Sequence, residues 1–293
     1  MSQGSLYVII PTTRGEKAFP SIYSALSQRG FENVFVLICG KSANNQEFAN
    51  QCLNKFNSRV IVLHCPAKEH ILPGEARNIG IEYVVRYANP SDYILFLDDD
   101  ICIPPNYAID LKNFISCHGL AAAMGNMTSF PINIWSKIID YSNFWWLQCN
   151  RDCLNRGWLG AGATILKISD ISSIRYLSDI AINEDIDFFD RISTLTTKKL
   201  GICSSIRSRH FHNRSSLIGL IKYQFLNGYR GPIYHLTRKR VILQSLKRWV
   251  SFSKVAIKEN INYLKYHIVE LIGVIFSFLI VECGAVLSTL RRR

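Results

Sequence analysis

Three consecutive aspartates, Asp98, Asp99 and Asp100, point most directly to chemistry in this sequence. They follow the apolar run 93–97, and three adjacent carboxylates at the end of a buried strand repel one another and lose hydration. A hard divalent cation offsets that cost, because Mg²⁺ or Mn²⁺ binds one or two carboxylates together with substrate phosphates. The triplet therefore predicts a site for a divalent metal and the diphosphate of an activated substrate. The alternative, a helix cap or a solvated loop, suits the apolar and proline-containing residues 101–105 poorly.

The elements that must position this triplet follow from apolar patterns in the first hundred residues. Four continuous apolar runs, at 6–10, 34–38, 60–63 and 93–97, are typical of parallel strands covered on both faces. Helical patterns lie between them, so we predict an α/β fold: a Rossmann-like, mostly parallel central sheet with helices on both faces. Ligands of such sheets gather at the carboxyl ends of the strands, which is where the three aspartates stand.

Composition and charge narrow the possible partners. The 293 residues are 48% hydrophobic and 19% charged, which excludes intrinsic disorder. The formal net charge is +12, but eleven basic and only three acidic residues from Arg238 onward account for +8 of it. The rest of the chain carries only +4, so we predict no nucleic-acid partner. Nine scattered cysteines without a CxxC pair indicate the reduced thiols of a cytosolic protein rather than a zinc site.

The C-terminal part differs from what precedes it, and we divide the chain into domains at 1–237 and 238–293. Residues 241–264 have the pattern of a basic amphipathic helix with Trp249, of the kind that lies on an anionic membrane surface. Residues 268–290 are strongly apolar, but their uninterrupted apolar stretch has eleven residues, fewer than the roughly 20 that span a bilayer. We therefore predict a membrane-associating helical appendage. An in-plane or re-entrant segment is favoured, and a true span or a helical pair packed on the main domain stays open.

Several segments resemble, in the same order, motifs of family 2 glycosyltransferases with the GT-A fold, and the likeness covers about residues 5–235. The segments are LYVIIPTTR at 6–14 for the first strand and donor-binding turn, GEARNIG at 74–80 for G-x-A-R-N-x-G, FLDDD at 96–100 for D-x-D, GAGA at 160–163 for the glycine-containing acceptor loop, and NED at 183–185 for the E-D motif. Each segment is weak or moderate evidence alone. Their shared order and spacing make the resemblance strong.

The resemblance implies transfer of a sugar from a nucleotide-diphosphate sugar to an acceptor hydroxyl, with inversion at the anomeric carbon and Mn²⁺ or Mg²⁺ as cofactor. We expect a glycan or lipid-linked glycan acceptor, in cell-envelope, polysaccharide or glycolipid synthesis. The expected location is cytoplasmic, peripheral or monotopic at the inner face of the cell membrane. The QxxRW segment of processive relatives is missing, which favours single addition. The alternatives are a nucleotidyltransferase acting on a sugar phosphate and a non-catalytic nucleotide-sugar binder.

Five carboxylates receive roles from this resemblance. Asp185 is the expected general base, and Glu184 is expected to position the acceptor. Asp100 is the expected metal ligand, whereas Asp98 meets the nucleoside or ribose and can share the metal. Asp99 joins the substrate-binding set. For Glu184 and Asp185 the alternative is an acidic pair that the dipole at a helix N-terminus favours.

The same resemblance implies a wider substrate-binding set. Its members are Pro11, Thr12 and Thr13 for the base, Arg14 in the same turn, Arg77 and Asn78 before the triplet strand, Gly160, Ala161 and Gly162 in the acceptor loop, and Arg230 for the diphosphate. For Arg77 a structural salt bridge is the alternative to a contact with donor phosphate. Family members usually carry an aspartate at the end of the second strand, but residues 37–42 offer no carboxylate. The nucleotide base of the donor is therefore held differently, or the donor is not of the common uridine type.

Two histidines after the last core strand, His210 and His212, are candidate metal ligands, because a neutral imidazole can complete a metal or diphosphate site. We expect at most one of them to serve, with His212 favoured. A plain surface histidine is the alternative for each.

Overall fold

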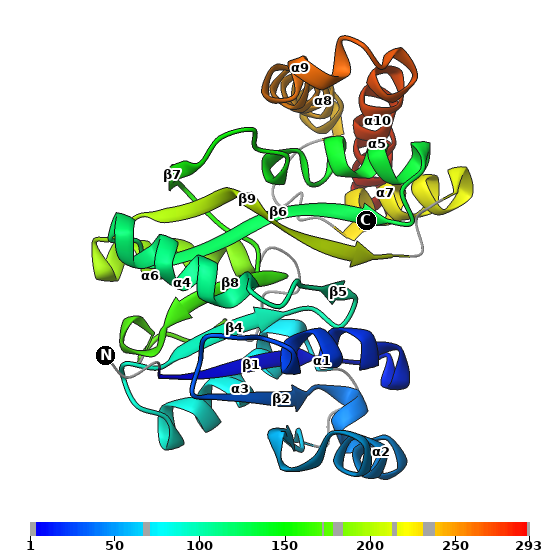
Figure 1. Cartoon of the computed structure of the whole chain (residues 1–293). Coiled ribbons are helices and arrows are strands. Elements are labelled where there is room, and N and C mark those ends of the chain that lie inside the picture. The colour runs from blue at the N-terminus through cyan, green and yellow to red at the C-terminus, as the bar shows by residue number, and fades with distance from the viewer. Residues whose placement is uncertain are drawn as a thin grey trace. The chain divides into compact units, whose positions relative to one another are not determined.

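The computed structural model describes residues 4–66, 71–171, 173–177, 184–212, 216–230 and 238–291. Its chain forms two compact units: Met1–Asn126 with Asn150–Arg209, and Met127–Cys149 with His210–Arg293. Figure 1 labels their strands and helices. The division at residue 237 stays a prediction.

The sheet has nine strands in the order β3-β2-β1-β4-β8-β6-β9-β5, with β7 paired to β9. The strands are β1 Ser5–Pro11, β2 Asn33–Cys39, β3 Val60–Val62, β4 Tyr93–Leu97, β5 Ile101–Cys102, β6 Ala122–Phe130, β7 Cys153–Arg156, β8 Ala163–Lys167 and β9 Leu200–Phe211. β1 pairs in parallel with β2 and β4, and β2 pairs in parallel with β3. β8 runs antiparallel to both β4 and β6. The predicted α/β fold is confirmed, and an antiparallel half extends its Rossmann-like parallel half.

Helices of the first unit lie between its strands along the chain, and several of them pack against the parallel strands. They are α1 Phe19–Leu26, α2 Gln46–Phe56, α3 Pro73–Tyr87, α4 Tyr107–His118 and α6 Glu184–Thr196. α3 packs against β1 and β2, and it does so closely, since a Cβ on Gly80 would lie 2.6 Å from Cγ2 of Ile9. One turn earlier on α3, Arg77 therefore comes to the carboxyl edge of β1, where the triplet also lies.

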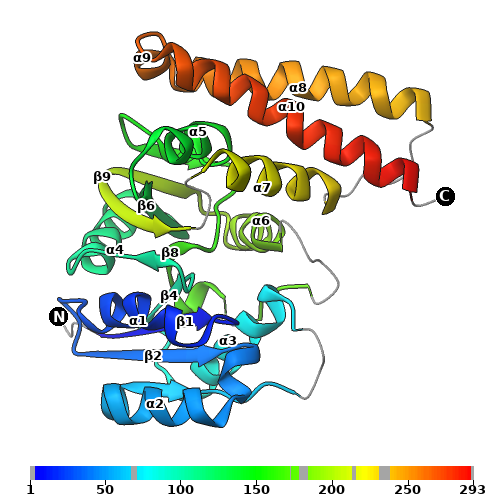
Figure 2. The ribbon, with the colours of Figure 1, turned by 90° about the vertical axis from the view of Figure 1, so that its right-hand side faces the viewer.

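The second unit is mainly helical. Its helices are α5 Ile134–Ser142, α7 Leu217–Arg230, α8 Arg238–Glu259, α9 Ile261–Leu264 and α10 Ile268–Arg291. α10 packs against α5, α7 and α8, and Figure 2 shows α8 and α10 lying side by side. A Cβ on Gly228 of α7 or Gly284 of α10 would overlap the backbone of the facing helix, so glycine permits this contact. The amphipathic helix predicted for 241–264 is present, but it breaks at Asn260.

One helix in the described part of the chain, at Ile268–Thr289, is long and apolar enough to cross a membrane, with 22 residues and a mean hydropathy of 2.3. This statement rests on length and composition only, and 39% of the apolar window is buried inside the structure. Both glutamates have partners: Glu282 pairs with Arg248 at 2.7 Å, and Glu270 accepts a hydrogen bond from the Tyr263 hydroxyl at 3.4 Å. The eleven-residue apolar stretch therefore understates the length of the apolar helix.

Candidate active site

The aspartate triplet forms the turn between β4 and β5, at the carboxyl edge of the parallel strands. The Asp98 amide donates to the Gly162 carbonyl at 2.9 Å, and the Ile101 amide donates to the Asp98 carbonyl at 3.1 Å. Because β4 pairs with β1, with Phe96 opposite Ile9, the turn after β1 comes beside the triplet. The strand alternation thus placed the triplet at the correct edge.

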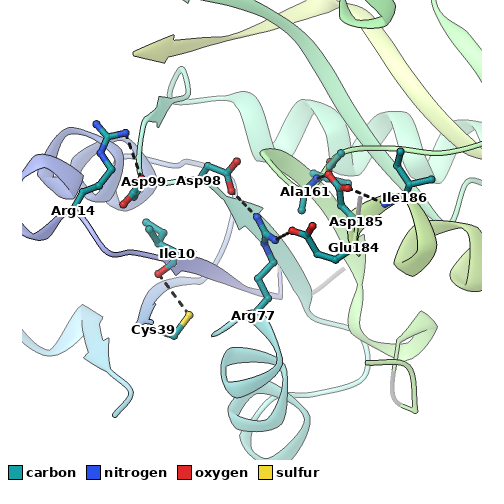
Figure 3. Close-up of polar contacts among 12 residues, drawn as sticks. Ile10, Arg14, Cys39, Arg77, Asp98, Asp99, Ala161, Glu184, Asp185 and Ile186 are labelled. Carbon is teal, nitrogen blue, oxygen red and sulfur yellow. Dashed lines mark hydrogen bonds and ion pairs between the residues drawn. The ribbon is translucent and has the colours of Figure 1, made fainter. Parts of the chain in front are cut away.

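Asp99 and Asp100 contact the turn after β1. The Thr12 hydroxyl donates to Oδ2 of Asp99 at 2.7 Å. Nη1 of Arg14 lies 2.8 Å from Oδ2 of Asp100 and 3.6 Å from Oδ1 of Asp99, and Figure 3 shows Arg14 and Asp99 facing each other. Burial raises the pKa of Asp99, and the Thr12 hydrogen bond and the Arg14 charge oppose that rise. The turn after β1 therefore supplies both a hydroxyl and a cation to the triplet.

Arg77 joins the aspartate triplet to Glu184, one of the two carboxylates predicted to act on the acceptor. Its Nη2 donates to Oδ1 of Asp98 at 2.7 Å, and its Nη1 donates to Oε1 of Glu184 at 2.9 Å (Figure 3). The residue is only 4% exposed, and its guanidinium carbon lies 5.5 Å from the ring centre of Tyr176. Asn78 fixes this wall, because its side chain bonds both the amide and the carbonyl of Tyr176, at 2.8 and 2.9 Å. The salt bridge considered as the alternative for Arg77 is therefore present.

Glu184 and Asp185 begin α6. Oδ2 of Asp185 accepts a hydrogen bond from the Ala161 amide at 3.2 Å, and its Oδ1 accepts one from the Ile186 amide at 2.9 Å. Burial raises the pKa of both carboxyls, and the charge of Arg77 opposes the rise. A carboxylate with a raised pKa is a stronger base than an exposed one, so the arrangement suits proton abstraction.

A cavity of about 340 Å³ brings these groups together, a size in the range of small-molecule sites. It is lined by Pro11, Thr12, Thr13, Gly40, Ile71, Pro73, Ala76, Arg77, Asp98, Asp99, Asp100, Glu184 and Asp185. Nine of these thirteen residues belong to the predicted site. The cavity is therefore polar on the triplet side and on the Glu184–Asp185 side.

The predicted acceptor loop lies against both sides of this site. The Gly162 carbonyl holds the Asp98 amide, and the Ala161 amide holds Asp185. A Cβ on Gly162 would lie 2.9 Å from Cδ1 of Ile101 and 3.4 Å from Oδ2 of Asp98. Glycine therefore lets the loop approach the triplet without displacing the Ile101 side chain, and the Gly160 carbonyl accepts a hydrogen bond from the Thr164 hydroxyl.

Some predicted positions fall outside this description. Asn183 of the E-D motif lies outside the described residues, as does the side chain of Arg230, whose backbone ends α7. His210 and His212 belong to the second unit, so their role as metal ligands stays a prediction. Both are buried, with ring centres 5.0 Å apart. The surface-histidine alternative is therefore wrong. Residues two apart on a strand lie on the same side, so their directions give no reason to expect only one to serve.

Sequence reasoning missed two residues that shape the site. Gly40 closes β2 with φ of +98°, and a Cβ there would lie 2.8 Å from the Thr12 carbonyl oxygen. A glycine directly after a buried strand is the signal that could have identified it. Tyr176 holds Arg77 and stacks on Phe188 with ring centres 3.9 Å apart. It comes from a loop with no pattern that marks it.

The triplet fits a divalent metal that shares its ligands with a substrate. Among the residues that the structure describes, no group of three or more histidine, cysteine, aspartate or glutamate side chains is arranged to hold a metal ion. Mg²⁺ and Mn²⁺ need no such cage, because they keep water and phosphate ligands beside one or two carboxylates. Asp98 and Asp100 would supply carboxylate oxygens to such a metal, and the guanidinium of Arg14 beside Asp100 shows that positive charge is accepted there.

The fold resembles solved structures of GT-A glycosyltransferases. S. aureus TarS 1-349 has a TM-score of 0.50 at 15% identity, covering 98% of this chain and 91% of that one. TarS 1-349 in complex with UDP-GlcNAc has a TM-score of 0.51 at 15% identity, covering 76% and 64%. GalNAc-T7 with UDP, GalNAc and Mn²⁺ has a TM-score of 0.51 at 11% identity, covering 77% and 48%. The chain thus spans less than two thirds of the two ligand-bound structures, and at these identities the likeness shows the GT-A fold.

The family itself comes from the sequence match. Residues 7–162, more than half of the chain, match the model of Glycosyl transferase family 2. This chain belongs to glycosyl transferase family 2. No curated protein matches it.

Proposed function

We propose that the protein transfers a sugar from a nucleotide-diphosphate sugar to an acceptor hydroxyl, with inversion at the anomeric carbon. The observation that carries this proposal is the cavity in which the triplet and the Glu184–Asp185 pair meet, joined by Arg77 at 2.7 and 2.9 Å. TarS with bound UDP-GlcNAc and GalNAc-T7 with bound UDP, GalNAc and Mn²⁺ share the fold and support a nucleotide-sugar donor.

The residues divide the chemistry between them. Asp185 removes the proton of the acceptor hydroxyl, whose oxygen forms a bond to the anomeric carbon. The bond from that carbon to the donor phosphate breaks, the nucleoside diphosphate leaves, and one displacement inverts the configuration. A divalent metal held by Asp98 and Asp100 would neutralise the departing diphosphate. Glu184 positions the acceptor, and Arg77 keeps Glu184 and Asp98 in place.

The turn residues Pro11, Thr12 and Thr13 line the same cavity, and in this proposal they hold the nucleotide base of the donor. Beside them β2 ends at Cys39 and is followed by Gly40, and neither residue carries a carboxylate. The base is therefore recognised by hydroxyl and backbone groups of this turn.

A panel of nucleotide sugars, each with Mn²⁺, tests the proposal. The true donor stabilises the native state by about 2.7 kcal/mol at a hundredfold excess over its Kd, which a thermal shift detects. Turnover with an acceptor then releases a nucleoside diphosphate. Release of pyrophosphate would instead establish the nucleotidyltransferase alternative, and binding without any turnover or hydrolysis would favour the non-catalytic binder. If no nucleotide sugar shifts the unfolding temperature, the donor site is wrong.

We assign the acceptor to cell-envelope glycan or lipid-linked glycan synthesis at the cytoplasmic side, by single addition. Two features support this assignment. All nine cysteines are free thiols, in keeping with a reducing compartment. The second unit carries a surface suited to an anionic membrane, and a membrane-bound acceptor needs its enzyme at that surface.

This surface has an apolar stripe and a basic flank. The apolar stripe consists of the exposed residues Val269, Ile272, Phe276 and Leu287 of α10. Exposed lysines of the neighbouring α8 supply the basic flank, with Lys247 and Lys254 in its middle. If α10 crossed the bilayer, α8 beside it would carry these lysines into hydrocarbon, at roughly 2.5–3.5 kcal/mol each. In our proposal both helices therefore lie in the membrane plane, with the stripe toward acyl chains and the lysines toward headgroups.

Vesicle flotation checks this part of the proposal. The full-length chain floats with vesicles containing phosphatidylserine, whereas Ile272→Glu/Phe276→Glu stays behind, because two charges interrupt the apolar stripe. Leu53→Glu on α2 is the matched control, since Leu53 is 49% exposed and belongs to the first unit. Equal flotation of all three proteins, or none of the full-length chain, would rule out this membrane surface. Point variants are preferable to removal of α10, which would uncover α5 and α7.

A further inference from the structure

Among the residues that the structure describes, Arg14 and Arg77 contact the aspartate triplet, and they differ in their freedom to move. Arg77 is 4% exposed and is held by Asp98, Glu184 and the ring of Tyr176. The side chain of Arg14 is 33% exposed. It lies against Asp100 and Asp99 from the solvent side of the turn after β1, without an aromatic wall among its described contacts.

The backbone of Arg14 is fixed even though its side chain is accessible. Its amide donates to the Thr12 hydroxyl oxygen at 3.2 Å, and the same hydroxyl donates to Asp99 at 2.7 Å. The next amide, of Gly15, donates to the Ser42 hydroxyl at 3.1 Å. The guanidinium can therefore leave Asp100 by rotation of side-chain torsions alone, while the turn keeps its shape.

We propose that Arg14 is an exchangeable counter-ion of the aspartate triplet: it holds Asp100 until a divalent cation displaces it, and it then binds the donor diphosphate. This inference rests on the proposed donor site. Its physical reason is that Arg14 and the metal carry like charge and require the same carboxylate oxygen, Oδ2 of Asp100, from which Nη1 of Arg14 is 2.8 Å away. A displaced guanidinium beside a bound diphosphate gains a bidentate partner.

Two consequences follow for binding. Without donor, Arg14 competes with the cation and lowers its affinity. With donor, the diphosphate gives Arg14 a new partner, so metal and diphosphate strengthen each other's binding, and the coupling is reciprocal. Arg77 cannot replace Arg14 in this exchange, because its two carboxylate partners and its burial hold it in place.

Manganese binding to the purified full-length protein tests the proposal without any turnover. Free Mn²⁺ is measured by electron paramagnetic resonance during titration of the wild type, Arg14→Gln and the control Arg59→Gln, which replaces an exposed arginine after α2. Arg14→Gln binds Mn²⁺ about tenfold more tightly than the wild type, a typical coupling between sites. Arg59→Gln matches the wild type. Unchanged or weaker Mn²⁺ binding by Arg14→Gln, or no binding by either protein, would overturn the competition.

A second titration uses the Mn²⁺–pyrophosphate complex, which carries the diphosphate without base or sugar. Here Arg14→Gln binds about tenfold more weakly than the wild type, so one substitution moves the two affinities in opposite directions. Equal or tighter binding of the complex would overturn the transfer of Arg14 to the diphosphate. The Mn²⁺ titration can succeed even if no nucleotide sugar is turned over, so failure of this inference is distinguishable from failure of the proposed function.

Discussion

Asp185→Asn lowers glycosyl transfer by about a thousandfold, within the range that a positioned general base supplies. The reason is that the amide cannot accept the proton of the acceptor hydroxyl. The backbone contacts of Asp185 with Ala161 and Ile186 are both made through its oxygens, and asparagine keeps one oxygen at that place. We therefore expect donor binding and cooperative unfolding to persist, which calorimetry and a nucleotide-binding titration check.

Asp187→Asn is the matched control for this experiment. Asp187 lies on the same helix and pairs with Arg191 on the surface at 2.7 Å, so its loss leaves transfer near the wild-type rate. If Asp185→Asn kept near-normal turnover, or Asp187→Asn lost as much, the assignment of the base would be wrong.

The pH dependence gives the same prediction a second readout. Burial raises the pKa of Asp185 above the ordinary 3.8, so kcat/KM falls as the pH drops through that raised value and the carboxylate becomes protonated. The stability effect has the opposite sign. Because the folded-state pKa is raised, the contribution of the Asp185 carboxyl to the free energy of unfolding is fully present below about pH 4. This contribution is lost as the pH rises through the folded-state pKa. The unfolding temperature of Asp185→Asn relative to wild type should therefore increase over that window.

Arg77→Met produces the largest loss of stability that we expect from one substitution. It leaves Glu184 without its cation in a buried place, and removal of one partner from a buried pair costs about 3–5 kcal/mol. We expect about 3 kcal/mol, the low end of this range, because the Asp98 side chain is 37% exposed and water replaces part of its interaction. Urea unfolding measures the change, and transfer activity is lost with it.

Two further variants separate the charge effect from a general loss of packing. Arg77→Met/Glu184→Gln recovers part of the stability, because the uncompensated carboxylate is gone, but it does not recover transfer. Arg86→Met, an exposed position on the same α3 helix, unfolds like the wild type. If Arg77→Met were as stable as Arg86→Met, the ion pairs of Arg77 with Asp98 and Glu184 would not contribute to the stability of the fold.

Much of the fold and the position of the aspartate triplet could be predicted from local patterns. The apolar runs 6–10 and 93–97 form buried strands because a doubly covered strand needs apolar side chains on both faces. The triplet then had to lie at the carboxyl edge, since parallel strands place those ends together. The break of the C-terminal amphipathic helix at Asn260 was not predictable, because the apolar spacing continues through it.

The contacts inside the site could not be predicted, because they join residues far apart in the chain. Arg77 and Glu184 are 107 positions apart, and Asn78 and Tyr176 are 98 apart. A guanidinium can pair with donor phosphate or with any nearby carboxylate, and its own sequence neighbourhood does not decide between them. The close packing of Gly80 on Ile9 and the start of α6 at Glu184 decide it.

The sequence by itself thus determined the α/β class, the edge at which the triplet lies and the family of the chain, since each depends on residue types in consecutive segments. The tertiary structure decided which charges meet: Arg77 with Asp98 and Glu184, and Arg14 with Asp99 and Asp100. It also packed α10 on α5, α7 and α8. These outcomes depend on hydrogen bonds and packing contacts, whose energies fall off steeply with distance. Only the folded arrangement of the elements therefore decides which residues make them.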